Sequence, residues 1–125
     1  ADCDSLREVH LGKAVRRIGN GAFADCVVLK ELTCPERLEI IGNHAFAGCE
    51  SMETLVLNDG LIAIGKDAFR GCKHLVKVKV PDTVMSIGEG AFRDCNALEK
   101  VVLPSGLKGL DATGIFGSRV RVEYV

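Results

Sequence analysis

Apolar residues along the chain fall into columns that recur every 23 residues. An Ile-Gly pair and an Ala-Phe pair repeat at this interval, as at Ile41-Gly42 and Ala45-Phe46. The cysteines that share the period are Cys3, Cys26, Cys49, Cys72 and Cys95. A fixed period between about 20 and 50 residues is typical of a solenoid, in which one supersecondary unit stacks on copies of itself. The aligned columns therefore predict one continuous core shared by all the coils.

Within each unit the pattern predicts a short strand, a corner and a turn. The segment 29–34 ends in apolar–polar alternation, which is typical of a strand, and equal spacing of such segments predicts a parallel sheet. Pro35 or an equivalent turn residue ends the strand. The Ile-Gly corner follows, where the glycine supplies either a positive φ or a close approach between backbones. The next stretch, 43–49, fits one or two helical turns, with Phe46 and Cys49 facing inward from the opposite wall.

The repeats divide a single domain, residues 1–125. Its units are 3–25, 26–48, 49–71, 72–94 and 95–117, followed by a closing segment, 118–125. The last unit departs from the pattern, because Phe116 comes one residue late and no glycine follows Leu110. Charged and apolar residues alternate over 119–124, which predicts a closing strand whose charges guard an exposed sheet edge.

Composition argues against several classes of function. The 125 residues are 47% hydrophobic and carry 16 basic against 17 acidic side chains, so we expect neither bulk electrostatic binding of nucleic acid nor a polybasic membrane anchor. No apolar run approaches the length of about 18 residues that spans a bilayer, so no membrane insertion is expected. Residues 1–4 do not form a signal peptide, so we expect either that a leader has been removed or that the chain is a fragment of a longer protein. Cys3 already stands in register with the repeat, which favours the fragment.

The cysteines and histidines do not predict a chemical site. Neighbouring strands lie about 4.8 Å apart, whereas a relaxed disulfide needs Cβ atoms about 3.8 Å apart, so we expect the periodic cysteines to be buried thiols. Cys34 falls in another apolar column and is expected in the core. No two cysteines have the short spacing of a zinc site, and His10, His44 and His74 fall in three different columns. We therefore expect no metal, no cofactor and no enzymatic activity.

The unit from Leu75 to Cys95, Leu-x-x-Val-x-Val-Pro-x-x-Val-x-x-Ile-Gly-x-x-Ala-Phe-x-x-Cys, resembles the leucine-rich repeat of the BspA type. The resemblance covers roughly residues 3–110. It implies an α/β, right-handed leucine-rich repeat solenoid with a parallel sheet of short strands on the concave face and short helical turns or loops on the opposite face. Such repeats occur mostly in secreted or surface proteins of bacteria and some protozoa. The resemblance thus implies a non-catalytic protein-binding module of an extracellular or cell-surface, adhesin-like protein.

Two outward-pointing columns of the strands form the expected binding face. Its residues are Glu8, Glu31, Thr54, Lys77 and Lys100 in one column and His10, Thr33, Val56, Lys79 and Val102 in the other. The face is acidic toward the N-terminus and basic toward the C-terminus, so we expect it to attract an acidic partner, for example a host extracellular or cell-surface protein.

An alternative treats the same charges as an ordinary solvated surface. The chain is then a structural spacer or self-associating unit of a larger surface protein, which stacks through an uncapped N-terminal coil. Glu8 and Glu31 are neighbouring carboxylates, but they lack the pocket that acid–base chemistry needs. The binding module and the spacer are therefore both expected to be non-catalytic.

Overall fold

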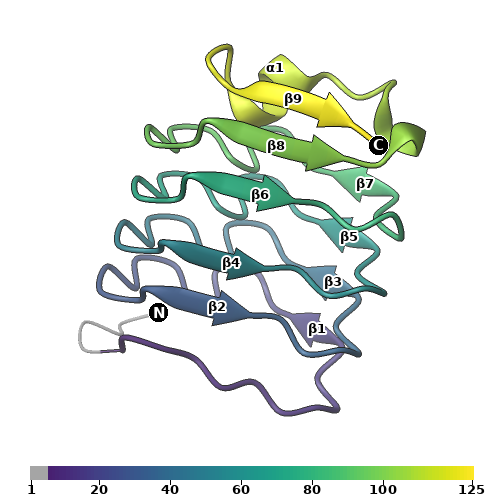
Figure 1. Cartoon of the computed structure of the whole chain (residues 1–125). Helices are drawn as coiled ribbons and strands as arrows, with labels where there is room; N and C mark the ends of the chain where they lie inside the picture. Colours follow the sequence, from purple (N-terminus) through teal and green to yellow (C-terminus); the bar gives the residue numbers. More distant parts are fainter. Residues whose placement is uncertain (1–5) are drawn as a thin grey trace.

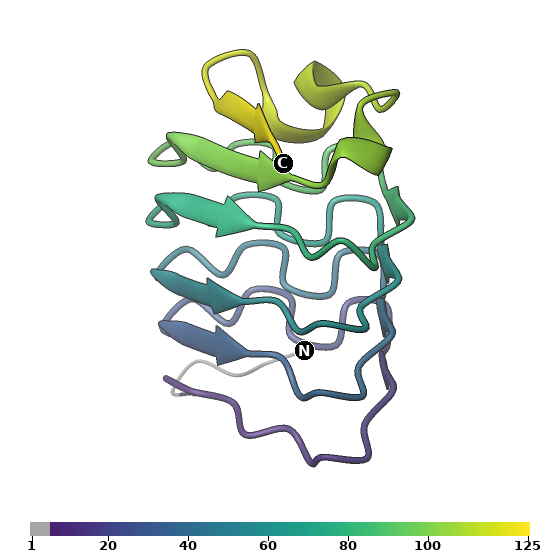
Figure 2. The same ribbon diagram turned by 45° about the vertical axis from the view of Figure 1, so that its right-hand side comes forward.

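Strands stack in two rows along the axis of a solenoid (Figure 1). The computed structural model describes residues 6–125. What we call the main strand row consists of β2 (Glu31–Thr33), β4 (Thr54–Val56), β6 (Lys77–Lys79), β8 (Lys100–Leu103) and β9 (Arg121–Tyr124). The corner row consists of β1 (Arg17–Ile18), β3 (Ile40–Ile41), β5 (Ala63–Ile64) and β7 (Ser86–Ile87). The two rows lie on two sides of each coil, and turns close the coil behind them (Figure 2).

Pairing in the main strand row is parallel and keeps the period of the sequence. β2 pairs with β4, and β8 pairs with β6 on one side and with β9 on the other. Leu32 faces Leu55, and Val78 faces Val101. The middle residue of each three-residue strand points inward, so Leu32 and Val78 are buried while the residues flanking them are exposed. The parallel-sheet solenoid expected from the spacing is confirmed.

The corner row is a four-stranded parallel sheet that the sequence analysis did not predict. Each of its strands is only two residues long, and the isoleucine of each strand is buried. The glycine that follows permits a close approach between coils, because a Cβ on Gly88 would lie 2.4 Å from the backbone nitrogen of Lys66. The φ angle of Gly88 is not positive. Of the two roles expected for this glycine, close backbone approach is the one that the structure shows.

The turns opposite the strands are not helical in the first four coils, contrary to expectation. These segments, 20–25, 43–48, 66–71 and 89–94, form what we call the turn row. Two positions in each coil adopt positive φ, as at His44 (59°) and Gly48 (77°), and a helix cannot continue through them. Their backbone groups bond to the next coil instead, as when Phe46 N donates to Ala68 O at 2.7 Å. The loop alternative is therefore correct for the first four coils.

The last coil closes differently. It contains a 3-10 turn, η1 (Ser105–Leu107), and one short helix, α1 (Ala112–Phe116). Asp111 caps α1, because its Oδ1 accepts from Gly114 N at 3.2 Å. The alternating segment after the helix forms β9, which runs parallel to β8.

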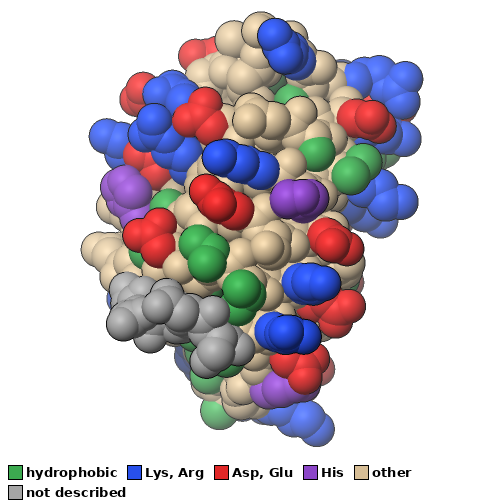
Figure 3. All heavy atoms as spheres, turned by 90° about the vertical axis from the view of Figure 1, so that its left-hand side faces the viewer, with side chains coloured by type: hydrophobic (Ala, Val, Ile, Leu, Met, Phe, Trp, Pro, Cys, Tyr) green, Lys and Arg blue, Asp and Glu red, His purple; other side chains and the backbone are tan. Residues whose placement is uncertain are grey.

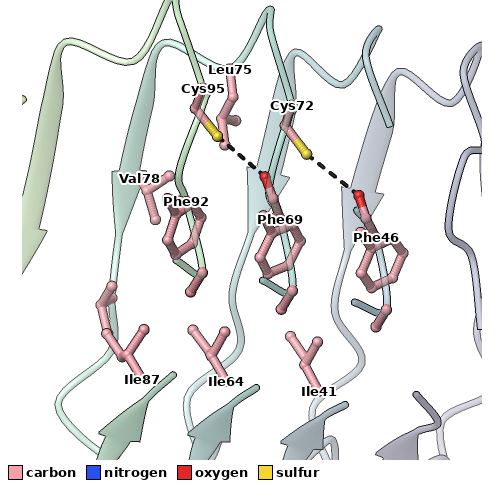
Figure 4. Close-up of a cluster of buried hydrophobic side chains, with 14 of the residues drawn as sticks. Ile41, Phe46, Ile64, Phe69, Cys72, Leu75, Val78, Ile87, Phe92 and Cys95 are labelled. Carbon is pink, nitrogen blue, oxygen red and sulfur yellow. Dashed lines mark hydrogen bonds between the residues drawn. The ribbon is translucent and has the colours of Figure 1, made fainter. Parts of the chain in front are cut away.

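Phenylalanines form a continuous stack through the core (Figure 4). The stack contains Phe23, Phe46, Phe69, Phe92 and Phe116, with neighbouring ring centroids 5.1–5.3 Å apart. Phe46, Phe69 and Phe92 are fully buried. Phe116 joins the stack although it comes one residue late in the repeat, because α1 replaces the turn of the other coils. The prediction of a shared dry interior lined by aligned phenylalanines is confirmed.

Cysteines line the same core beside the phenylalanines. Each thiol of Cys49, Cys72 and Cys95 donates to the carbonyl of the phenylalanine 26 residues earlier, at Sγ–O distances of 3.2, 3.6 and 3.2 Å. Figure 4 shows the bonds of Cys72 and Cys95. Cys34 is a buried free thiol, as expected. Cys26 is also buried but is disulfide-bonded, so the expectation of a thiol is wrong there. The expected position of Cys3 in the ladder lies outside the described residues.

Candidate binding face

The structure aligns the ten residues of the expected binding face along the main strand row and the coil before it. Eight of them are exposed, and Lys100 and Val102 are half-buried. The facing pairs are Glu8 with Glu31, Glu31 with Thr54, Thr33 with Val56, Lys77 with Lys100 and Lys79 with Val102. The two columns thus exist as expected, but they are divided between β4 and β6, which do not pair.

One rung of backbone hydrogen bonds is missing at this division. At three other junctions of the row, the residue just before the strand donates to the preceding coil: Lys30 N to Arg7 O, Glu53 N to Lys30 O and Glu99 N to Val76 O. At the last junction the first residue of β9 does so, with Arg121 N donating to Glu99 O. The equivalent bond from Val76 N to Glu53 O is not formed among the described residues. Within that same part of the chain, Leu57 N also makes no bond to Lys79 O, whereas the corresponding Val80 N donates to Val102 O at 2.9 Å.

A groove follows the missing rung. It consists of two adjoining hollows of about 470 and 250 Å³, which share Leu55, Val56 and Lys79. The groove could not be predicted from the sequence, because the 23-residue period continues unchanged from β4 to β6. The only sequence signal near it is Asn58, which stands where three other coils have proline.

Asn58 binds the preceding coil rather than the following one. Its Nδ2 donates to Leu38 O at 2.8 Å and to Glu36 O at 3.3 Å. The side chain is buried, and its Oδ1 has no hydrogen-bond partner among residues 6–125. Asn58 therefore ties the end of the β4 segment to the coil before it, on the side away from β6.

Lysines dominate the face on the C-terminal side of the division. Lys77 and Lys100 lie directly opposite each other on paired strands, an arrangement that is unfavourable for like charges. Lys100 Nζ is 3.0 Å from Glu123 Oε2, so its charge is partly compensated. Within the described part of the chain, Lys77 and Lys79 have no carboxylate within 4.0 Å. Two uncompensated positive charges therefore project from β6.

The face has the opposite character at its N-terminal end. Glu8 and Glu31 are joined by a parallel bridge, and His10 Nε2 lies 3.4 Å from Glu8 Oε1. Glu8, His10 and Glu31 line a shallow hollow of about 170 Å³, which offers no enclosed site for paired carboxylates. Figure 3 views the molecule from the side on which the main row's strands begin; basic side chains gather along the upper part of its right-hand edge, and acidic and basic ones mix below. The predicted gradient of charge along the face is present.

A second charged cluster lies on the turn row. Asp67 is only 6% exposed, and its Oδ2 lies 3.2 Å from His44 Nε2 and 3.9 Å from Arg70 Nη1. Arg70 also binds Asp94, with Nε 3.2 Å from Oδ2. The His44–Asp67 and Arg70–Asp94 pairs connect successive coils, whereas Asp67 and Arg70 belong to the same turn. No group of three or more His, Cys, Asp and Glu residues that could hold a metal ion occurs in the described part of the chain.

Burial suppresses the chemistry of the core thiols Cys34, Cys49 and Cys72. Burial raises the pKa of Cys34 to about 12 and that of Cys49 to about 11. The side-chain hydrogen bond with Cys95, together with burial, raises the pKa of Cys72. Because the thiolate is the reactive form of cysteine, these three side chains are protonated and inert at neutral pH.

Comparison with known proteins identifies the repeat. The family described as the BspA type leucine rich repeat region matches residues 1–119 in 6 copies. The chain belongs to this family. Comparison with curated protein sequences finds no match. Among residues 6–125, no helix has both the length and the apolar character needed to cross a membrane.

Solved structures share the fold of this BspA-type chain. A leucine rich cell surface protein of Faecalibacterium prausnitzii is 24% identical, with a TM-score of 0.85 over 95% of this chain. The chain spans only 32% of that protein. A leucine-rich repeat protein of T. pallidum is 30% identical (TM-score 0.60, 94% of this chain, 68% of that one), and one of Bacteroides capillosus is 28% identical (TM-score 0.70, 78% and 76%).

The BspA-type repeat accounts for the inward columns but not for the chemistry of the outer face. The coils share their buried Ile, Ala, Phe and Cys columns, whereas the outward column in the middle of the face reads Thr54, Lys77 and Lys100 in successive coils. Packing restricts the inward columns to apolar residues of similar shape, and it places no such restriction on the outward ones. The outer face is therefore where the coils of this chain differ most from one another.

Proposed function

We propose that the chain is a non-catalytic protein-binding module of a secreted or cell-surface, adhesin-like protein, and that it binds an acidic protein through the outer side of the main strand row. The observation that supports this is the pair Lys77 and Lys79, exposed on β6 without a carboxylate partner in the described part of the chain. Uncompensated charges on a rigid surface steer oppositely charged partners toward it.

Family membership supports the same proposal. One similar protein is described as a cell surface protein, and repeat solenoids use their extended faces for binding. The ten residues of the face include no aromatic side chain, and aromatic residues dominate tight interfaces. We therefore expect a weak interaction that gains strength when several modules act together.

Capture of extracellular proteins on the immobilised chain tests the proposal. The double variant Lys77→Glu with Lys79→Glu should lose an acidic binding protein while retaining its thermal melting curve, because both side chains are exposed. The matched control is Lys13→Glu with Lys66→Glu, which changes the net charge equally at two exposed sites away from the face. Equal capture by both double variants would place the binding site elsewhere.

The alternative, a spacer or self-associating unit, is supported by the small share of the F. prausnitzii protein that the chain spans. Light scattering at high protein concentration separates the two functions. A monomer that captures a partner agrees with a binding module. Concentration-dependent assembly without any captured partner agrees with a spacer that stacks on further coils.

A further inference from the structure

The groove between β4 and β6 gives the proposed binding face a more definite ligand. We propose that it takes an extended peptide segment of the partner, in which one carboxylate side chain lies among Lys77, Lys79 and Lys100 and the flanking residues are small and uncharged. This inference rests on the proposed function and adds the chemistry of the segment that is bound.

Among residues 6–125, the missing rung leaves backbone groups along the groove without backbone partners. In a parallel ladder, alternate residues direct their N–H and C=O groups to the same neighbouring strand. Thr54 and Val56 bond to the β2 side, since Thr54 N donates to Lys30 O and Val56 O accepts from Cys34 N. Leu55 therefore directs its N–H and C=O toward β6, with which β4 does not pair. An extended peptide supplies donors and acceptors of the kind that such groups bind.

The lining of the groove favours short side chains. It runs along β4 from Glu53 past Leu55 and Val56, and its opposite bank is formed by β6. Val102 of β8 adds a further apolar contact, and Pro81 lies at the far end. Val56 is 47% exposed, so apolar surface is available to a ligand there. A strand-like segment with small apolar residues would cover this surface.

Charge along the groove changes sign, and this restricts the ligand further. The two uncompensated ammonium groups lie at the middle, on β6, with Lys100 beside them on β8. Acidic residues lie at the two ends, Glu53 at one and Asp59 at the other. A polyanion would be repelled at both ends, whereas a single central carboxylate meets only positive charge. The groove therefore fits one Asp or Glu within an otherwise uncharged segment.

Synthetic peptides test this inference directly. The probe is a terminally capped nine-residue peptide of alternating valine and serine with one central aspartate, and its binding is followed by fluorescence anisotropy at low salt. We expect it to bind about tenfold more tightly than the same peptide with central asparagine, because charge-assisted hydrogen bonds to the lysines are lost. Equal affinity of the two peptides would overturn the inference. Tighter binding of nona-glutamate or of a heparin fragment would do so as well, and the latter would indicate a site for sulfated polysaccharide.

Lysine variants locate the carboxylate. Lys77→Gln and Lys79→Gln should each weaken binding of the aspartate peptide about three- to tenfold, while Lys13→Gln leaves it unchanged. Nuclear magnetic resonance on the wild-type protein gives an independent measurement, because the amide signals of Leu55, Leu57 and Val76 should shift on titration. Shifts confined to other parts of the chain would contradict the proposed position.

These results distinguish the groove from the broader proposal. If a captured protein depends on Lys77 and Lys79 while the aspartate and asparagine peptides behave alike, the groove inference is wrong and the proposed function stands. If the aspartate peptide binds as expected but no captured protein depends on these lysines, the peptide site stands and the proposed protein-binding function is wrong.

Discussion

The turn row and the main strand row come from the same repeat, but only one of them is continuous. Each junction of the turn row carries a short backbone bond, such as Phe23 N to Ala45 O and Phe69 N to Ala91 O, both 2.7 Å. In the main strand row, β4 and β6 do not pair, although the residues on both sides of this junction keep their register of 23. The coils remain stacked because the phenylalanines between them are in contact from Phe23 to Phe116.

This difference shows which part of the repeat holds the solenoid together. The turn row and the corner row fix the spacing of the coils with inward side chains and backbone bonds that scarcely vary. The main strand row can therefore open at one junction without loss of the stack. The open junction is also the place where the charge of the outer face changes, from Thr54 on β4 to Lys77 on β6.

The largest expected effect comes from breaking the phenylalanine stack. Phe69→Ala should lower the free energy of unfolding by about 3–5 kcal/mol, because it removes a fully buried ring that contacts Phe46 and Phe92. Urea denaturation measures the loss. Met85→Ala is the control, since that side chain is 77% exposed and should change stability by less than about 0.5 kcal/mol. Similar losses in the two variants would contradict the idea that the stack holds the coils together.

The corner row should be sensitive to a single methyl group. Gly88→Ala places a Cβ against backbone atoms of Lys66 and Gly65, and we expect it to cost about 1–3 kcal/mol as the coils move apart. Gly19→Ala is a matched control in the same column, because no atom of the described residues lies within 4 Å of its added Cβ. If thermal melts show the two variants equally stable, close approach does not determine the spacing of the coils.

Stability should decline in alkaline solution because of the core thiols. Burial raises the pKa of Cys34 from 9.0 to about 12, so the folded state holds a proton that the unfolded state releases between these values. The stabilisation is complete below pH 9.0 and is lost as pH rises toward about 12, by at most about 1.4 kcal/mol per pH unit. Cys34→Val, which matches Val80 in the same column, should make the decline shallower.

Urea denaturation at about pH 8 and about pH 10.5 measures how steeply the free energy of unfolding falls with pH in the wild type and in Cys34→Val. Some decline should persist in the variant, because burial also raises the pKa of Cys49 to about 11. An unchanged slope in Cys34→Val would show that this thiol ionises equally well in the folded and unfolded chains.

The inward half of the structure could be predicted from the sequence, since packing demands the same residues in every coil. The Phe46 and Phe69 column, the buried Cys72 and the parallel strands all follow from a period of 23 in apolar residues. The positions of the two outward columns follow too, because side chains alternate along a strand.

The conformation of the turn row could not be predicted with the same rules. His44 and Asp67 adopt positive φ in a column where other coils have glycine. The pattern of apolar and polar residues in these short segments does not indicate that backbone conformation. The corner strands were missed because two residues are too few to show alternation. The missing rung depends on the distance between two coils, which a pattern of residue types does not specify. Near it, Asn58 is the one residue that departs from the proline of three other coils.

Hydrogen exchange should show the difference between the two rows without any change in stability. The amides of Leu57 and Val76 make no backbone hydrogen bond in the described part of the chain, whereas the equivalent Cys34 and Glu99 amides donate at 2.9 and 2.8 Å. We therefore expect Leu57 and Val76 to exchange at least about tenfold faster, since exchange there needs no opening of a bonded rung. Equal protection of these two and of Cys34 and Glu99 would mean that β4 and β6 pair in solution. The groove would then be closed in the free protein, and a ligand would have to separate the strands to enter it.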